Sequence, residues 1–185
     1  LIDADMDRAE GEALDISHGV PFSKHMKIYA GTYEDIVDAA IIIITAGANQ
    51  KPDETRLDLV HKNVAIFRSI IPEIAKRNCA GILLIVSNPV DILTYTAIKL
   101  SGFTENRVIG SGTVLDTARL KYELSEHLSV DSRSIHAFII GEHGDSEIAA
   151  FSSANVSGIA LSEFCEMRGH YDHEANTRQI AENVK

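Results

Sequence analysis

The amino-acid sequence predicts an α/β fold in which helices cover both faces of a parallel sheet. Three observations predict this fold class. Short runs of apolar, often β-branched residues recur along the chain, amphipathic helical stretches separate them, and the connections between them are short. Residues 40–45 are apolar at every position but the last, which is typical of a parallel strand that is buried on both faces.

The first half of the chain alternates strands and helices. Residues 1–3 have the pattern of the end of a strand, and residues 6–17 carry apolar side chains at helical spacing. Gly19 and Pro21 then end that helix. The other elements expected in this half are a short strand at 27–30, a helical turn at 34–39 and the buried strand at 40–45, which Gly47 closes.

The second half continues this alternation. A long helix is expected at 55–78, with Pro72 as a kink, because its apolar residues follow one another at spacings of three and four. The elements expected after it are a buried strand at 81–86, a helix that ends at Gly102, a strand at 107–110, a helix capped by Thr113 with Asp116, strands at 135–140 and 148–152, and a polar helix at 172–184.

Composition argues against two classes of partner. With 185 residues, 45% of them hydrophobic, the chain can bury a core and is expected to form one or two soluble globular domains. The net charge of -10 argues against a nucleic-acid surface, which needs clustered Lys and Arg. The apolar runs are far shorter than the roughly 20 residues that cross a bilayer. We therefore expect neither a nucleic-acid nor a membrane partner.

Cysteine usage and the ends of the chain give further expectations. Cys79 and Cys165 have no second cysteine at metal-ligand spacing, so we expect reduced thiols, a cytoplasmic protein and no metal site. The chain begins without Met and without a signal-peptide pattern. We expect it to be a fragment that lacks both ends of a longer protein.

Candidate binding residues follow the predicted strands, because ligands of parallel α/β sheets bind at the carboxyl ends of the strands. Asp3 ends the first strand, where an acid in a dinucleotide-binding fold hydrogen-bonds the adenosine ribose. A solvated strand-end acid is the alternative. The next two strands end in small residues that offer exposed amides to a cofactor, namely Thr45, Ala46 and Gly47 and then Val86, Ser87 and Asn88. The glycine-rich loop that accompanies such an acid would precede residue 1.

One histidine stands out by its surroundings. His143 lies between two glycines and two acids directly after the apolar run 135–140. A histidine where a strand gives way to a loop, with little bulk beside it, can reach a ligand. That position suits an acid/base, although most histidines are ordinary surface or core residues.

Four long motifs resemble the lactate and malate dehydrogenase family, and its lactate-specific members most of all. They are GANQKPDETRLDLVHKN (47–63), SNPVDILTY (87–95), VIGSGTVLDTARL (108–120) and IIGEHGDSE (139–147). The resemblance implies a partial Rossmann-type parallel sheet domain at 1–110, followed by part of an α+β substrate domain at 111–185. It also implies NAD as cofactor and reversible hydride transfer between NADH and pyruvate, a step of fermentative glycolysis.

The resemblance assigns four residues to the reaction. Hydride transfer to a keto acid needs a group that exchanges the hydroxyl proton, and His143 matches the catalytic histidine of the family. Asp116 matches the acid that orients the ring and favours the imidazolium; a helix-capping role is the alternative. Arg119 matches the arginine whose planar guanidinium group binds the substrate carboxylate through two hydrogen bonds. Arg56 matches a second arginine, on a closing loop, which polarises the reacting carbonyl.

Other residues are assigned to specificity, cofactor binding and assembly. A neutral Gln50 on the closing loop favours a small uncharged substrate end, because the second carboxylate of oxaloacetate would be buried unpaired. Asn88 resembles the asparagine that contacts substrate and nicotinamide, and Asn63 and Ser111 are weaker cofactor candidates. Many bacterial relatives are homotetramers that fructose 1,6-bisphosphate activates through an arginine and a histidine. Lys121 departs from that pair and His136 matches it.

Three alternatives stay open at this point. The chain could come from a relative that acts on bulkier 2-hydroxy acids, such as a hydroxyisocaproate dehydrogenase, or on malate. It could be a non-catalytic binding module, which the presence of all four reaction residues disfavours. It could also be inert in isolation, because a pyrophosphate needs the N-terminus of a helix that would precede residue 1.

Overall fold

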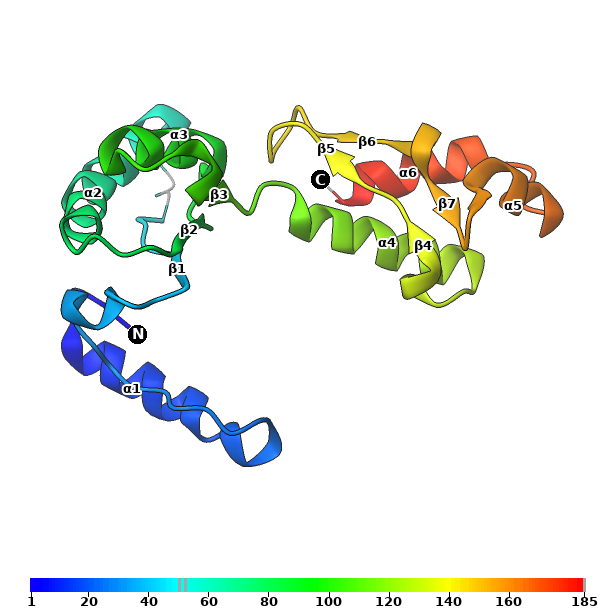
Figure 1. Cartoon of the computed structure of the whole chain (residues 1–185). Helices are drawn as coiled ribbons and strands as arrows, with labels where there is room; N and C mark the ends of the chain where they lie inside the picture. Colours follow the sequence, from blue (N-terminus) through cyan, green and yellow to red (C-terminus); the bar gives the residue numbers. More distant parts are fainter. Residues whose placement is uncertain (50, 52, 185) are drawn as a thin grey trace. The chain divides into compact units, whose positions relative to one another are not determined.

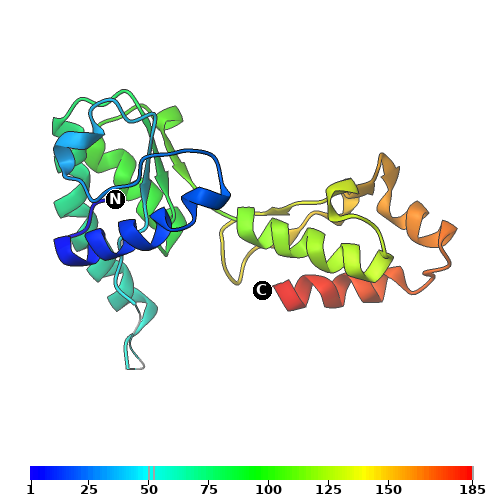
Figure 2. The ribbon, with the colours of Figure 1, turned by 90° about the horizontal axis from the view of Figure 1, so that it is seen from below.

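The computed structural model describes residues 1–49, 51 and 53–184, which form two compact units (Figures 1 and 2). The first unit comprises residues 1–87 and 92–109. The second comprises residues 88–91 and the described chain from residue 110 onward. No described helix is both long enough and apolar enough to cross a membrane.

The first unit is built around a three-stranded sheet in the order β1-β2-β3. Strands β1 and β2 are parallel, with Ile41 opposite Ile82 and Ile44 opposite Ile85, and this confirms the predicted α/β class. The elements that lie wholly or mostly in this unit are, in chain order, α1 (Met6–Ser17), the 3₁₀ helices η1 (Val20–Phe22) and η2 (Tyr33–Ile36), β1 (Ile41–Ile44), α2 (Arg56–Lys76), β2 (Ile82–Ile85), α3 (Val90–Ser101), η3 (Glu105–Arg107) and β3 (Val108–Gly110).

Local sequence explains where these helices begin and how tightly the strands pack. Asp5 caps α1, and Thr55 with Asp58 forms a reciprocal capping box at the start of α2. Pro72 lies inside α2. At Gly81 a Cβ atom would lie 2.1 Å from the carbonyl oxygen of Ala39, so only glycine fits where the chain enters β2. The fully buried side chains of this unit come mainly from α2, β2 and α3 and include Phe67, Ile71, Leu83, Ile85 and Leu93.

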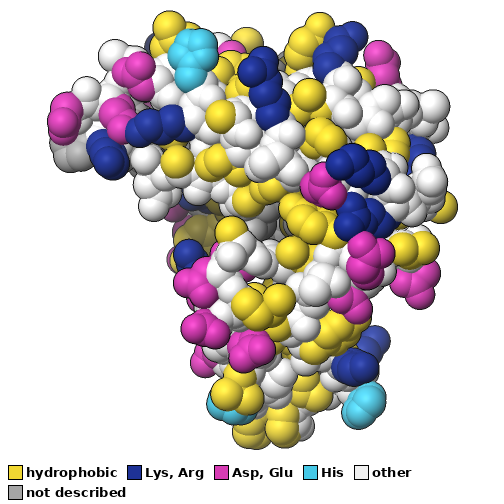
Figure 3. Space-filling view, turned by 90° about the vertical axis from the view of Figure 1, so that its left-hand side faces the viewer, with side chains coloured by type: hydrophobic (Ala, Val, Ile, Leu, Met, Phe, Trp, Pro, Cys, Tyr) yellow, Lys and Arg dark blue, Asp and Glu magenta, His cyan; other side chains and the backbone are white. Residues whose placement is uncertain are grey.

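Three local predictions for this unit were wrong. Residues 1–3 and residues 27–30 form no strands, although the backbone of Leu1 hydrogen-bonds Tyr29 and Gly31. The helical turn expected at 34–39, in contrast, is present as the 3₁₀ helix η2, which Thr32 caps. Strand β1 is not buried on both faces, because Ile41 and Ile43 are about 60% exposed. Apolar side chains are visible on the surface of this part of the molecule (Figure 3).

The described residues of the second unit form two small antiparallel sheets, three α-helices and two 3₁₀ helices. The sheets have the orders β4-β7-β8 and β5-β6. Leu120, Leu124 and Leu128 of α4 are fully buried in a core with Ile135 and Val156 of the strands. The elements are α4 (Val114–Leu128), η4 (Ser132–Ser134), β4 (Ile135–His136), β5 (Ile139–Ile140), β6 (Ile148–Ala149), η5 (Phe151–Ser153), β7 (Asn155–Val156), β8 (Ile159–Ala160), α5 (Leu161–Met167) and α6 (His173–Val184).

The strand predictions for this unit were too long. The run 135–140 is divided into β4 and β5, and the run 148–152 into β6 and η5. Strands of two residues show no alternation that a sequence pattern could reveal. The hairpin β7–β8 and helix α5 were missed, although Ser157 and Gly158 form a two-residue turn in which both φ angles are positive. A Ser-Gly dipeptide is a signal for such a turn.

Candidate active site

His143 lies in the loop between β5 and β6 of the second unit, which the positive φ angles of Gly141 and Gly144 help to turn. Its side chain is 30% exposed, so one edge of the ring can be reached from outside. Its backbone N–H donates a 3.1 Å hydrogen bond to the carboxylate of Asp91, which belongs to the same unit, and this bond anchors the loop. The imidazole therefore stands on an anchored loop.

Asp116 and His143 form a hydrogen-bonded pair. The Nδ1 atom of His143 lies 2.7 Å from Oδ2 of Asp116, whose side chain is only 2% exposed. A carboxylate in this position accepts the Nδ1 proton, fixes the tautomer and favours the imidazolium form, which leaves Nε2 to exchange a proton with a ligand. The alternative role of Asp116, as a helix cap with Thr113, was wrong: the Thr113 side chain makes no capping hydrogen bond.

Two threonines fix the distance between helix α4 and strand β5. Thr113 Oγ1 donates a 2.6 Å hydrogen bond to the carbonyl oxygen of Ile139, and the N–H of Ile139 donates a 2.9 Å hydrogen bond to Thr117 Oγ1. Both backbone groups of one strand residue are therefore bonded to the first turns of the helix that carries Asp116. This arrangement sets the separation of Asp116 and His143 in space although they are 27 residues apart in sequence.

Replacing Thr117 with Val should test this arrangement. The valine keeps the shape of the side chain but leaves the Ile139 N–H without its acceptor, so the free energy of unfolding should fall by about 1–3 kcal/mol. Chemical denaturation of the whole protein measures the change. Thr96→Val is the matched control, because the Thr96 hydroxyl bonds only its own helix, to the carbonyl oxygen of Ile92, and its effect should stay within about 0.5 kcal/mol. Equal effects of the two changes would contradict the anchoring role.

Arg119 lies one turn after Asp116 on the same helix. Its Nη1 atom is 3.3 Å from Asp116 Oδ1, and its side chain is 52% exposed. A guanidinium has five N–H donors in a planar fork, so the group can contact Asp116 and still present donors to a carboxylate outside the protein. The structure thus brings together His143, Asp116 and Arg119, three of the four residues assigned to the reaction.

The sequence analysis missed two carboxylates beside this group. Asp91, which accepts the N–H of His143, lies inside the motif at 87–95 but was given no role. Glu147 is buried, and its Oε2 atom lies 3.9 Å from His143 Nδ1. The sequence offered one signal for Glu147: it lies four residues after the histidine and directly before an apolar strand residue. An acidic residue at the start of a strand is unusual.

The same group is the place in the described chain where a metal ion could find ligands. Each of three residues offers one possible ligand atom, and these atoms all lie within 4.8 Å of one another; the residues are Asp116, His143 and Glu147. The Nδ1–Oδ2 separation of 2.7 Å is a hydrogen-bond distance. Two ligand atoms on a tetrahedral ion would be about 3.3–3.5 Å apart. The residues as they stand are arranged for proton sharing.

In the first unit, side-chain hydrogen bonds connect the segments that follow the carboxyl ends of β1 and β2. The residues at this edge of the sheet are exposed. Ser87 Oγ donates hydrogen bonds to the carbonyl oxygens of Ile44, at 3.2 Å, and Ala46, at 2.7 Å. The buried Asn63 side chain accepts the N–H of Ala48 at 2.7 Å. Thr45, Ala46, Gly47 and Val86 are exposed above these contacts. Ser87 and Asn63 therefore support this edge from inside, and the exposed residues beside them remain accessible to a ligand.

The remaining predicted residues lie as follows. Asp3 is exposed, and its carboxylate accepts the N–H of Asp5. Arg56 is the first residue of α2, in the first unit, and Gln50 lies outside the described residues.

In the second unit, Asn88 is exposed and precedes a cis peptide bond to Pro89, and Ser111 lies between β3 and α4. Lys121 is partly exposed on α4, and His136 is exposed on β4.

Comparison with family models decides where this chain belongs. Residues 1–110 match the NAD binding domain of lactate/malate dehydrogenases, and residues 113–185 match the alpha/beta C-terminal domain of the same enzymes. The chain belongs to the lactate/malate dehydrogenase family. The match covers both units and confirms the resemblance seen in the four motifs.

Relatives within the family are similar over most or all of this chain. L-lactate dehydrogenase of Acetivibrio thermocellus is 54% identical over 185 residues, which are 100% of this chain and 58% of that protein. L-lactate dehydrogenase 1 of Clostridium acetobutylicum is 58% identical over 166 residues, which are 90% of this chain and 53% of that protein. The chain thus spans a little over half the length of the curated relatives it matches.

Solved structures of the family have the same fold. The ligand-bound minor L-lactate dehydrogenase of Enterococcus mundtii superimposes with a TM-score of 0.92 at 46% identity, covering 100% of this chain and 59% of that one. A lactate dehydrogenase from a Medee basin deep-sea metagenome library gives a TM-score of 0.91 at 45% identity, covering 99% of this chain and 60% of that one. These matches confirm the predicted fold class, a Rossmann-type sheet followed by an alpha/beta domain.

Proposed function

We propose that the protein is an NAD-dependent L-lactate dehydrogenase that transfers a hydride reversibly between NADH and the keto carbon of pyruvate. The observation that carries the proposal is the 2.7 Å hydrogen bond between His143 and the buried Asp116, with Arg119 on the other carboxylate oxygen. An oriented imidazole beside an exposed guanidinium is what a 2-keto acid requires, because the acid presents a carboxylate next to the carbonyl that must be protonated. The family match supports the same reaction.

The residues at the ends of β1 and β2 fit the cofactor. Thr45, Ala46 and Gly47 are exposed and small, which allows a ligand to approach this edge closely. Asp3 would bind the adenosine ribose, and Asn88 and Ser111 would contact the nicotinamide end. When bound, the nicotinamide supplies or accepts the hydride. The domain boundary that we propose, between residues 110 and 111, separates all of these residues except Ser111 from the proton-transfer pair.

The side chains of the chain have separate tasks in the proposed reaction. His143 donates the Nε2 proton to the carbonyl oxygen of pyruvate as the carbonyl carbon is reduced, and it takes the proton back from lactate in the reverse direction. Asp116 stabilises the imidazolium that precedes donation. Arg119 binds the substrate carboxylate, and Arg56 polarises the carbonyl when its loop closes and excludes water.

Turnover of three keto acids by the whole protein tests the proposal. NADH oxidation should be fastest with pyruvate, and kcat/KM for oxaloacetate should be lower by about 100-fold or more, because Gln50 offers no charge to a second carboxylate. Preference for 2-oxoisocaproate would indicate a hydroxyisocaproate dehydrogenase, and preference for oxaloacetate a malate dehydrogenase. Failure to oxidise NADH with any of the three would favour a non-catalytic module.

We also propose a cytoplasmic homotetramer that fructose 1,6-bisphosphate activates. Lys121 and His136 are accessible on one unit and can attract a phosphate, Lys121 as a point charge without the arginine fork. The bisphosphate should lower the pyruvate concentration that gives half-maximal rate, and the double change Lys121→Ala with His136→Ala should abolish that effect while Lys76→Ala should not. A pyruvate saturation curve that the bisphosphate leaves unchanged would end this proposal, and light scattering would test the tetramer.

A further inference from the structure

Glu147 is a buried carboxylate that none of the steps above uses. Its side chain is 3% exposed, and one oxygen, Oε2, is 3.4 Å from the N–H of Gly144 and 3.9 Å from His143 Nδ1. The other oxygen, Oε1, is buried and has no hydrogen-bond partner. The N–H of Glu147 bonds the carbonyl oxygen of Gly144 at 3.1 Å, so the residue closes the turn that follows His143.

A buried carboxylate with one unbonded oxygen is unfavourable unless a positive charge lies close to it. Within the described part of the chain, the group that can supply that charge within 4.0 Å is the ring of His143. The ring is positive only when it is protonated. Glu147 therefore attracts the protonated ring of His143 much more strongly than the neutral ring. This difference favours the protonated state.

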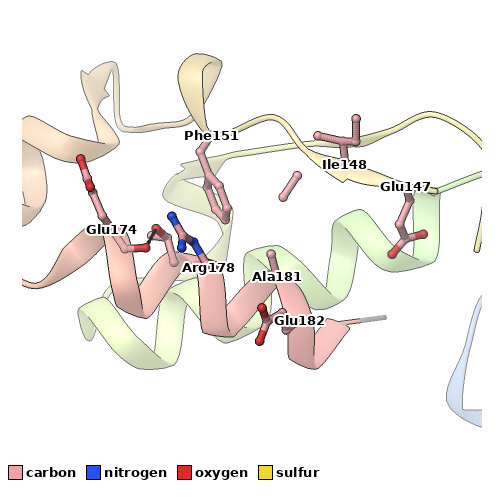
Figure 4. A pocket seen from close by; sticks show the side chains of 9 residues that line it. Glu147, Ile148, Phe151, Glu174, Arg178, Ala181 and Glu182 are labelled. Atoms are coloured by element: carbon pink, nitrogen blue, oxygen red, sulfur yellow. Dashed lines mark hydrogen bonds between the residues drawn. The ribbon is translucent and has the colours of Figure 1, made fainter. Parts of the chain in front are cut away.

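The other charged groups around Glu147 lie on three helices. Asp116 and Arg119 come from α4, and Asp91 from the start of α3. Glu147 also lines a groove of about 510 Å³ along α6, whose charged residues are Glu174, Arg178 and Glu182 (Figure 4). In the close-up, Glu147 lies at the end of this groove away from Arg178, which is near Phe151. Apart from the ring of His143, no cation among the described residues forms an ion pair with Glu147.

The position of Arg119 explains why a second carboxylate matters here. Arg119 lies against Asp116 at 3.3 Å and offsets part of its negative charge. Asp116 still orients the ring through its hydrogen bond, but less of its charge is left to stabilise the imidazolium. Glu147 has no such partner, and at 3.9 Å from Nδ1 in a buried setting its attraction for the ring is only weakly screened.

We propose that Glu147 is a positioning residue whose carboxylate, together with Asp116, holds the proton on His143. The inference rests on the proposed function, because the retained proton is the one donated to pyruvate. Its consequence is that pyruvate reduction stays fast at a higher pH than the Asp116 pair alone would allow.

Glu147→Gln in the whole protein tests the inference, with Glu142→Gln as the matched control. Both changes remove one carboxylate from the same loop, but Glu142 is exposed and bonds Ser146. In Glu147→Gln, kcat/KM for pyruvate should be close to normal at pH 6 and about 10-fold lower at pH 8, with the midpoint of the pH profile lower by about one pH unit. Glu142→Gln should leave the midpoint within about 0.2 pH units, because an exposed charge is screened.

An NMR titration of the His143 ring in the same proteins gives a readout that does not depend on turnover. Its midpoint should move to lower pH in Glu147→Gln and stay in place in Glu142→Gln. An unmoved NMR midpoint, or a loss of activity that is equal at every pH, would overturn the inference and leave the proposed function standing. A shifted NMR midpoint in a protein that does not reduce pyruvate would instead overturn the proposed function.

Discussion

Replacing His143 with Asn is expected to lower kcat/KM for pyruvate by about 10²–10⁴-fold in the whole protein. The reason is that an amide cannot supply the proton that the carbonyl oxygen must receive as the hydride arrives, and a positioned acid/base contributes a factor of this size. Asn keeps a polar group near the Nδ1 position, so Asp116 is left with a partner and the fold should tolerate the change.

The control for this prediction is His25→Asn, which changes an exposed histidine of the first unit. It should leave kcat/KM unchanged. NADH affinity, measured by fluorescence titration, should be nearly the same in His143→Asn as in the unchanged protein, because His143 has no proposed contact with the cofactor. A His143→Asn protein that retains more than about a tenth of the normal kcat/KM would contradict the acid/base role.

Replacing Asp116 with Asn should lower kcat/KM for pyruvate by about 10²–10³-fold near pH 8, and the loss should be smaller at lower pH. The neutral amide has nearly the shape of the carboxylate but cannot stabilise an imidazolium, and its NH₂ group can hold the ring in the wrong tautomer. Pyruvate reduction needs the protonated ring, and without the carboxylate a smaller fraction of the protein carries that proton as the pH rises. The loss should therefore be greater at high pH than at low pH.

Steady-state kcat/KM values for pyruvate and for lactate at pH 6 to 9 measure this pH dependence, and at each pH the two should fall by the same factor because the equilibrium constant of the reaction fixes their ratio. The matched control is Glu126→Gln, because Glu126 is an exposed acid on the same helix. It should not change either rate. If Asp116→Asn lowered kcat/KM by the same factor at every pH, Asp116 would be acting only as a structural residue, and thermal unfolding of the variant would show how much stability it contributes.

The sequence predicted the larger elements because their patterns are long enough to reveal a period. Helix α2, with its apolar spacing and its Thr55 cap, lies close to where it was predicted. The two-residue strands β7 and β8 and the seven-residue helix α5 do not span enough chain for a period to be visible. Whether a face of β1 is exposed depends on which elements pack against it in the folded chain, and the local sequence pattern does not contain that information.

The candidate site shows the same division between local and tertiary information. The position of His143 after an apolar run could be predicted from neighbouring residues, and the resemblance paired it with Asp116. The geometry of that pair depends on Thr113 and Thr117, which bond the backbone of Ile139 across the gap between helix and strand. Thr113 had been expected to cap α4. Glu147 and Asp91 approach His143 only in the folded chain, so their part in the site became visible only in the structure.

Proton uptake on binding of oxamate, an amide analogue of pyruvate, to the complex of the whole protein with NADH tests the central claim most directly. The claim is that the site binds a keto acid with His143 protonated. At pH 8, calorimetry in buffers of different ionisation enthalpy should show uptake of up to about one proton per site. The uptake should vanish in His143→Asn. Binding without proton uptake in the unchanged protein, or equal uptake in the two proteins, would contradict the account.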